Sequence, residues 1–288
     1  MERCGDRSSS TQSGVMAFFH EFPATWLPRI EAELQVCMTQ AARELTIGAA
    51  GEYALMGPGK RLRPLLTLMA ADSCGADPSS AMPAAMAIEM VHAFSLVHDD
   101  LPCMDDDDMR RGRPTTHKKF GEAMALLAGD ALLASAFQKL SLLPPADAAK
   151  CMQELSFAVV MMIEGQALDI KGFQKPPTVE DLDHLNGLKT GMLIASALRM
   201  GAIAALASAS ELEALSTFGR ALGLAFQITD DLLDDDDGQW TYSRLLGKEE
   251  SRKRARTLID DGVKALEGFG KKGENLRTLA AAVVERDH

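Results

Sequence analysis

Apolar residues recur along most of the chain at the spacing of α-helices. Near the N-terminal end, four of them stand four positions apart and would share one helical face: Trp26, Ile30, Leu34 and Met38. Further helices are predicted over 121–142, 147–171, 179–187, 190–207, 211–234 and 247–267. No segment alternates apolar and polar residues as a half-buried strand does. The pattern predicts an all-α fold, a bundle of about ten helices.

Composition supports this fold and limits the classes of function. Apolar residues make up 47% of the 288-residue chain and aromatic residues only 5%, which suits closely packed helices better than a β-sandwich. No linker divides the middle, so we expect one domain over 23–288 behind a disordered polar leader over 1–22. The net charge of −11, with no long basic stripe to offset it, argues against a sequence-independent nucleic-acid binder.

The cysteines and the apolar runs indicate in which compartment the protein is located and whether it spans a membrane. The five cysteines are scattered without a CxxC pair, which is typical of a reduced, cytoplasmic protein without structural zinc. No apolar run reaches the roughly 18 residues that a membrane span needs, because charges, Gly or Ser interrupt the candidates around 121–137 and 192–209. We therefore expect a soluble protein with no membrane span.

The apolar pattern over 84–101 runs directly into an acidic cluster, HDDLPCMDDDD. A bare DDDD tract is usually a solvated loop, but these carboxylates emerge from a buried helix, where they repel one another unless a cation lies between them. In a straight helix Asp99 and Asp105 would point about 120° apart. We expect Pro102 to distort the helix and bring them together. Asp106 is the alternative ligand if the helix stays straight.

A second acidic cluster, FQITDDLLD, ends the helix predicted over 211–234. Asp230 and Asp234 stand four residues apart on one helical face, so a single ion can bridge them; an exposed acidic pair is the alternative. Mg²⁺ prefers one or two carboxylates together with waters and substrate phosphates. Two carboxylate faces opposed across a cavity therefore predict a phosphorylated ligand between them.

Basic residues accompany the acidic clusters and fit the same ligand. Guanidinium groups bind phosphate bidentately. One such residue alone is commonly a surface residue, but a set beside an acid-lined cavity favours phosphate binding. The set has three members in the turn GPGKRLRP and three after the first acidic cluster: Lys60, Arg61 and Arg63, then Arg110, Arg111 and Arg113.

Five motifs in combination resemble one known family. They are GPGKRLRP, EMVHAFSLVHDDLPCMDDDDMRRGRPTTH, EGQALDI, LKTG and FQITDDLLD, and the resemblance extends over about 51–265. The sequence is similar to the trans-prenyltransferases (isoprenyl diphosphate synthases), especially the bacterial-type farnesyl and geranylgeranyl diphosphate synthases. The resemblance implies an all-α homodimer with a central catalytic cavity. It also implies a magnesium-dependent condensation of isopentenyl diphosphate with an allylic diphosphate, dimethylallyl or geranyl, with three ions once substrate is bound.

The resemblance also implies roles for individual positions. Isopentenyl diphosphate would be held by Lys60, Arg63, His92 and Arg111, with the role of Arg61 open. The allylic diphosphate would be held by Arg110, and its side of the cavity lined by Lys189, Thr190 and Gln227. The magnesium ligands or their neighbours would be Asp99, Asp100, Asp105, Asp230 and Asp234. The residues closest to the chemistry would be Asp99, Asp105, Lys189 and Asp230, with Gln166 and Asp169 behind them.

Product length is expected to depend on the apolar floor below Asp99. Phe94 lies five residues upstream, more than one helical turn away, and Ser95 is next to it. In the family that the sequence resembles, a bulky aromatic residue here stops growth near farnesyl diphosphate and a smaller one permits geranylgeranyl diphosphate. We therefore predict farnesyl diphosphate, with geranylgeranyl diphosphate as the alternative product and an ordinary core role as the alternative for Phe94.

One segment departs from the family pattern. Family members follow the second aspartate motif with a lysine-containing loop, whereas here the chain passes almost directly to Thr241-Tyr242 and Gln239 stands where the lysine is expected. Cationic contacts to the allylic diphosphate would then be missing and a flap that excludes water shortened, unless Lys248 compensates. The alternative function is therefore a weakly active or non-catalytic partner subunit of a prenyl synthase.

Overall fold

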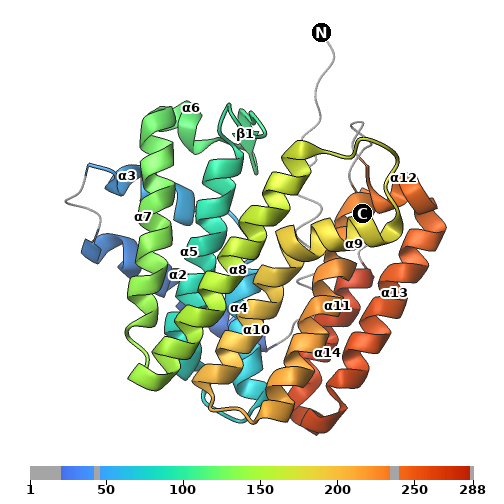
Figure 1. Ribbon diagram of the computed structural model, residues 1–288. Coiled ribbons are helices and arrows are strands. Elements are labelled where there is room, and N and C mark those ends of the chain that lie inside the picture. Colours follow the sequence, from blue (N-terminus) through green and yellow to red (C-terminus); the bar gives the residue numbers. More distant parts are fainter. Residues whose placement is uncertain (1–20, 42–45, 234–239, 286–288) are drawn as a thin grey trace.

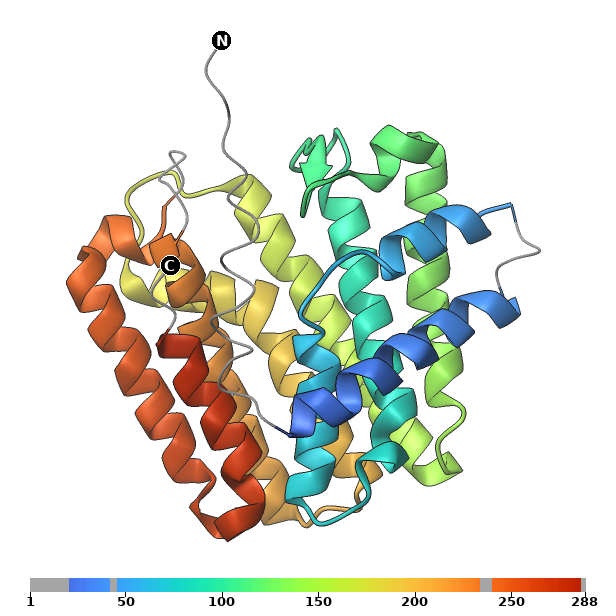
Figure 2. The same ribbon diagram turned by 180° about the vertical axis from the view of Figure 1, so that it is seen from behind.

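The computed structural model describes residues 21–41, 46–233 and 240–285, with 38–41 described by their backbone alone. These residues are almost entirely helical, and the long helices form one bundle seen from two sides in Figures 1 and 2. The predicted all-α fold is confirmed. The predicted leader over 1–22 falls almost wholly outside the described residues.

The helices follow one another along the chain in this order. In the first half they are α2 (Phe22–Ala41), α3 (Gly48–Leu55), α4 (Leu62–Ser73), the 3₁₀ turn η1 (Pro78–Ala81), α5 (Met82–Asp99), α6 (Thr116–Phe120) and α7 (Glu122–Leu140). In the second half they are α8 (Pro145–Lys171), α9 (Val179–Asn186), the π-helical turn η2 (Gly187–Gly191), α10 (Met192–Ala204), α11 (Ala209–Leu233), α12 (Tyr242–Leu246), α13 (Lys248–Ala265), the 3₁₀ segment η3 (Glu267–Gly273) and α14 (Glu274–Val284).

The segments with helical periodicity fold as predicted. The six helices expected after 120 begin and end within three residues of α7, α8, α9, α10, α11 and α13. On α2, Trp26, Ile30 and Leu34 are buried together in the core, and the side chain of Met38 lies outside the described residues. The helices α3, α6, α12 and α14 were not predicted: α6 and α12 have five residues each, too few for a helical period, and the longer α3 and α14 were missed.

Helix α10 is the centre of the bundle and packs against α4, α5, α8 and α11. Its apolar residues are buried on all sides, as expected for a helix with neighbours all round. The approach to α4 depends on Gly201, where a Cβ atom would lie only 2.0 Å from the carbonyl oxygen of Thr67. Only glycine allows two backbones to come this close, so Gly201 sets the spacing between the two helices.

The acidic cluster after α5 folds back, in line with the effect expected of Pro102. Helix α5 ends at Asp99, and the backbone N–H of Asp105 donates to the carbonyl oxygen of Asp99 at 2.9 Å. A small antiparallel hairpin then pairs β1 (Met109–Arg110) with β2 (Arg113–Pro114), so the expectation of no strand is wrong here. Each strand has two residues, too few to show alternation, and the turn needs positive φ at both Arg111 (51°) and Gly112 (75°), as a type I′ turn does.

The predicted helices over 179–187 and 190–207 are joined by η2, a π-helical turn that carries Lys189 and Thr190. Such turns are rare and occur frequently at functional sites. The turn packs on α8 at Gly165, where a Cβ atom would lie 2.4 Å from the backbone nitrogen of Lys189. The glycine of the motif EGQALDI thus lets α8 touch the backbone that presents Lys189.

Two described helical segments are long and apolar enough to span a membrane by length and composition, which corrects the expectation that no run reaches that length. They are Pro78–Asp99 and Glu122–Leu140. In the first, 67% of the apolar window is buried inside the bundle, as in the core helix of a soluble protein, and in the second 33% is buried. The second therefore leaves apolar side chains uncovered.

Candidate functional site

A cavity of about 1460 Å³ lies between α4, α5, α8, η2 and α11. Its lining includes most of the predicted site residues: Lys60, Arg63, His92, Phe94, Ser95, Asp99, Arg110, Arg111, Lys189, Thr190, Gln227 and Asp230. Gln166 of EGQALDI, predicted to lie behind the chemistry, also lines the cavity, so the fold gathers residues from five motifs that are far apart in the sequence. Asp100 and Asp105 are not part of the lining, and Asp234 lies outside the described residues.

One end of the cavity, called here the cationic end (Lys60, Arg63, Arg110 and Arg111), concentrates positive charge. The Nε atom of Arg63 is buried and has no hydrogen-bond partner among the described residues. Burial lowers the pKa of Arg63 to about 10, and the neighbouring Arg111 acts in the same direction, against Glu89. A buried N–H without an acceptor and crowded cations are both relieved by an anion, so this end fits a phosphate group.

His92 stands on α5 among these arginines. Burial lowers the pKa of His92 well below its usual value, and the charges of Arg63 and Arg111 add to the effect. The imidazole is therefore neutral near neutral pH, when one ring nitrogen donates a hydrogen bond and the other accepts one. A neutral His92 can donate to a phosphate oxygen without adding another charge to the cationic end.

Arg61 has a different role from its neighbours in the basic turn. Its guanidinium is ion-paired with Glu31 on α2 at 2.7 Å and with Glu89 on α5 at 2.9 Å, and it also donates to the carbonyl oxygen of Gly57 at 2.9 Å. These ion pairs outweigh burial and raise the pKa of Arg61. Arg61 therefore holds the turn in place. Arg61 still lines the cavity, whereas Arg113 does not, and the guanidinium of Arg113 packs 3.8 Å from the centre of the Tyr53 ring.

Two carboxylates from different helices line the cavity, Asp99 at the end of α5 and Asp230 on α11. Burial raises the pKa of Asp99 to about 6; Lys189 opposes this rise and Asp105 adds to it. A bound cation would stabilise such a buried carboxylate. Among the described residues, no three His, Cys, Asp or Glu side chains converge closely enough to hold a metal. Mg²⁺ accepts a few carboxylates and completes its shell with water and phosphate oxygens, and the two cavity aspartates are donors of that kind.

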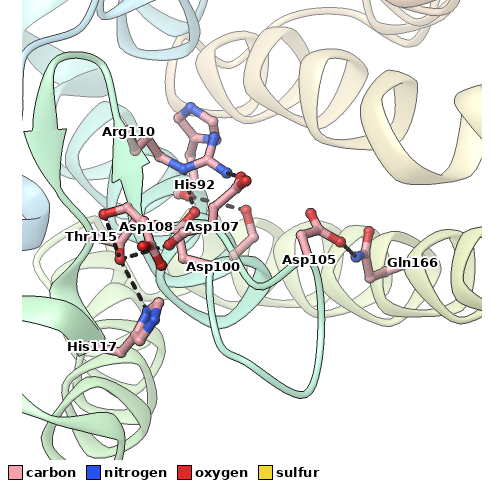
Figure 3. A network of polar contacts seen from close by, with 10 residues as sticks. His92, Asp100, Asp105, Asp107, Asp108, Arg110, Thr115, His117 and Gln166 are labelled. Carbon is pink, nitrogen blue, oxygen red and sulfur yellow. Dashed lines mark hydrogen bonds and ion pairs between the residues drawn. The ribbon is translucent and has the colours of Figure 1, made fainter. Parts of the chain in front are cut away.

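The other carboxylates of the first acidic cluster make contacts within the protein (Figure 3). Asp100 is only 3% exposed and accepts a hydrogen bond from Nε of Arg110 at 2.5 Å, while Asp107 lies 3.3 Å from Nη2 of the same arginine. Asp105 points the other way, toward Gln166 on α8, whose Nε2 donates to it at 3.4 Å. Asp100 therefore fixes an arginine of the cationic end.

A chain of hydrogen bonds extends from the cavity wall to the C-terminal helices. Thr190 Oγ1 donates to Oε1 of Gln227 at 3.1 Å, and Nε2 of Gln227 donates to Asp231 at 3.0 Å. Asp231 also accepts from the backbone N–H of Tyr242 at 3.0 Å. The fully buried Tyr242 in turn donates its hydroxyl to Asp183 at 2.8 Å, and Arg254 also bonds this carboxylate.

Sequence reasoning missed the contribution of Tyr242 and Asp183. Thr241-Tyr242 was noted only as the place where the family pattern resumes, and no motif contains Asp183. Asp169 was predicted to lie behind the residues closest to the chemistry. It forms an ion pair with Lys189, whose Nζ lies 2.5 Å from the Asp169 carboxylate on α8.

The far side of the cavity is apolar. Phe94 is 6% exposed and lines the cavity, and its ring meets that of His98 edge-on with centroids 4.8 Å apart. Apolar residues of other helices also line the cavity, among them Leu65, Met162, Leu193, Phe226 and Leu279. A cationic end, two facing carboxylates and an apolar side thus share one cavity.

The sequence model of the family described as polyprenyl synthetase matches residues 44–244. The chain belongs to the polyprenyl synthetase family. It is 40% identical over 268 residues to geranylgeranyl pyrophosphate synthase 11, chloroplastic, of Arabidopsis thaliana, covering 84% of this chain and 75% of the relative. It is 42% identical over 210 residues to the farnesyl diphosphate synthase of Geobacillus stearothermophilus, covering 70% of this chain and 71% of the relative.

Solved structures agree with this assignment of the polyprenyl synthetase. An FPP/GFPP synthase from Zymomonas mobilis superposes with a TM-score of 0.85 at 36% identity, covering 94% of this chain and 99% of that one. A geranyltransferase from Legionella pneumophila superposes with a TM-score of 0.86 at 34% identity, covering 97% and 99%. The predicted family is confirmed, and the chain is a prenyltransferase of that family.

Proposed function

We propose that this polyprenyl synthetase condenses isopentenyl diphosphate with dimethylallyl or geranyl diphosphate and releases mainly farnesyl diphosphate. The observation that carries the proposal is the single cavity with a cationic end, carboxylates on two helices and an apolar side. Each feature matches one part of the substrates: an anion, a metal-bound leaving group and a hydrocarbon tail.

The cationic end binds the diphosphate of isopentenyl diphosphate. Lys60, Arg63 and Arg111 supply charge, and the unpartnered Nε of Arg63 supplies a buried donor. Neutral His92 adds a directional hydrogen bond. Together they orient the double bond of this substrate toward the carboxylate pair, and orientation of two reactants is itself a large source of rate.

The allylic substrate lies on the side of Lys189, Thr190 and Gln227, with Arg110 on its diphosphate. Asp99 and Asp230 would hold magnesium, with Asp105 nearby. The chemistry that Mg²⁺ supplies when bound is Lewis-acid stabilisation of the charge on the departing diphosphate. Lys189 and the Thr190–Gln227 dipoles are preorganised near that charge, and the apolar side keeps water away from the allylic carbocation. Three bound ions, and a role for Asp234, remain predictions.

Product length follows from the depth of the apolar side. Phe94 lines the cavity more than one helical turn before Asp99, and its bulk there supports farnesyl diphosphate as the main product. Phe94→Ala should deepen the cavity and raise the share of geranylgeranyl diphosphate, because a longer tail then fits. An unchanged product length in an isotope-labelled chain-length assay would assign Phe94 to the core alone.

We further propose that the protein is a homodimer in which a second copy covers the apolar face of α7 and α8. These neighbouring helices expose Leu127 (50%), Phe157 (56%) and Val160 (57%), and contiguous apolar surface usually marks an interface. Light scattering should give the dimer mass. Leu127→Glu with Phe157→Glu should halve it, whereas Leu206→Glu, at a more exposed leucine (76%) that follows α10, should not.

A cytoplasmic location belongs to the same proposal. The four described cysteines are free thiols, as in a reducing compartment. Fractionation of cells that produce the native chain should place it with the soluble proteins; recovery in the membrane fraction would contradict this part.

The decisive experiment incubates the purified chain with dimethylallyl diphosphate, isopentenyl diphosphate and Mg²⁺ and identifies the products by chain length. Farnesyl diphosphate is expected, and addition of EDTA should abolish it. No product from the folded, magnesium-loaded protein would favour a non-catalytic partner subunit. The segment that motivates this alternative, which begins at Asp234 and includes Gln239, lies outside the described residues.

A further inference from the structure

Three residues confine the side chain of His98 at the edge of the cavity: Phe94 on α5, and Leu126 and Gly129 on α7. It stands one helical turn after Phe94 on α5, and the two rings meet edge-on at 4.8 Å with an interplanar angle of 74°. Its Nε2 lies 3.0 Å from the carbonyl oxygen of Leu126 on α7. Because a carbonyl oxygen only accepts hydrogen bonds, Nε2 carries the hydrogen.

Helix α7 leaves space for the His98 ring at a glycine, Gly129. At Gly129, a Cβ atom would lie 2.2 Å from Nε2 and 2.4 Å from Cδ2 of His98. Any larger residue would therefore displace the ring. The glycine and the hydrogen bond together leave His98 one place to lie, between α7 and Phe94.

This arrangement bears on how firmly Phe94 closes the cavity. Both residues line the cavity, and the imidazole packs edge-on against the Phe94 ring on the side of α7. Closely packed side chains leave no free volume for such a movement. Removing the imidazole opens a gap next to Phe94, into which the ring can turn.

We propose that His98 is a positioning residue for product length: it holds Phe94 across the cavity, so that the chain stops at farnesyl diphosphate. The inference rests on the proposed function and deepens it. Phe94 supplies the obstacle, while His98, Gly129 and the Leu126 carbonyl determine whether the obstacle stays in place.

The test compares product lengths of the full-length protein and two variants with dimethylallyl diphosphate, isopentenyl diphosphate and Mg²⁺. His98→Ala removes the ring, and His98→Asn removes the ring but keeps an amide that can donate to Leu126. Both should raise the ratio of geranylgeranyl to farnesyl diphosphate on the order of tenfold, the discrimination that one missing group in an apolar pocket supports. His184→Ala, at an exposed histidine on α9, is the matched control and should keep the wild-type ratio.

Circular dichroism melts establish that each variant is folded, and His98→Asn decides if His98→Ala is not. A wild-type product ratio in the folded variants, while Phe94→Ala lengthens the product, would overturn the positioning role alone. No prenyl product from the wild-type chain would instead overturn the proposed function and this inference with it. A change in total rate without a change in product ratio also counts against the proposal, because a general loss of packing lowers the rate and leaves the ratio unchanged.

Discussion

The two acidic clusters use their paired aspartates in the same way but hold different partners. In each, the first carboxylate lines the cavity, Asp99 on one side and Asp230 on the other. The second carboxylate turns to the protein, where Asp100 holds the guanidinium of Arg110 and Asp231 holds the uncharged donors of Gln227 and Tyr242. Successive residues of a helix point about 100° apart, so an adjacent pair can serve the cavity and its support at once.

The difference lies in what each supporting carboxylate balances. Asp100 neutralises a partly exposed arginine that lines the cavity, whereas the hydrogen bonds described for the Asp231 carboxylate come from two neutral groups, the Gln227 amide and the Tyr242 backbone. Loss of the first removes the nearer counterion of Arg110 and leaves only Asp107 at 3.3 Å, and loss of the second removes an acceptor from two neutral donors. The four substitutions that follow separate these cases.

Asp99→Asn should have the largest effect. The change keeps the shape of the side chain but removes the negative charge to which the proposed function assigns the metal. The rate of condensation should fall on the order of 10²–10³-fold, as when one preorganised electrostatic group is lost from an active site. Steady-state kinetics measures it, with Asp108→Asn, at an exposed aspartate of the same acidic cluster, as the control; equal losses in both variants would remove Asp99 from the chemistry.

Asp100→Asn should cost about 10–100-fold, the usual cost of losing a partner that orients a group in direct contact with the ligand. Arg110 would lose its charge partner at 2.5 Å, so KM for the allylic diphosphate should rise while the magnesium dependence stays near that of the wild type. A shifted magnesium dependence with an unchanged KM would instead make Asp100 a metal ligand, as the family resemblance implied.

Asp231→Asn should lower activity by about tenfold or less. The asparagine oxygen can still accept one of the two hydrogen bonds, and one unsatisfied donor costs about 1–3 kcal/mol. The kinetics should be compared with those of Asp100→Asn. A larger loss in Asp231→Asn than in Asp100→Asn would contradict the distinction between charged and neutral partners.

Tyr242→Phe should have the smallest effect on activity. The backbone N–H that Asp231 accepts remains, while the hydroxyl bond to Asp183 is lost. We expect the free energy of unfolding to fall by about 1–3 kcal/mol with little change in kcat, as measured by urea denaturation and by kinetics at a temperature where the variant is folded. A strong loss of kcat at full stability would place Tyr242 in the site itself.

The sequence predicted elements wherever the helical period was long and regular. The six helices after 120 have nearly the expected bounds, because one buried face per helix leaves a periodic signal that does not depend on the neighbours. The short elements were not predicted from the sequence. The hairpin at Arg110 has two residues per strand, and the π-helical turn at Lys189 differs from an α-helix by a single added residue per turn, so neither carries a usable period.

The sequence also predicted which residue types would line the cavity, because charged residues in these motifs favour the binding of metal ions and diphosphates. Which member of each motif faces the ligand was decided by the tertiary structure. Arg61 and Arg63 are two residues apart in one turn, yet Arg61 is ion-paired with Glu31 and Glu89 while Arg63 keeps a buried N–H toward the cavity. Side-chain direction depends on where a helix ends and on what packs beside it, and those neighbours, such as Gly165 beside Lys189 and Gly129 beside His98, come from distant parts of the chain.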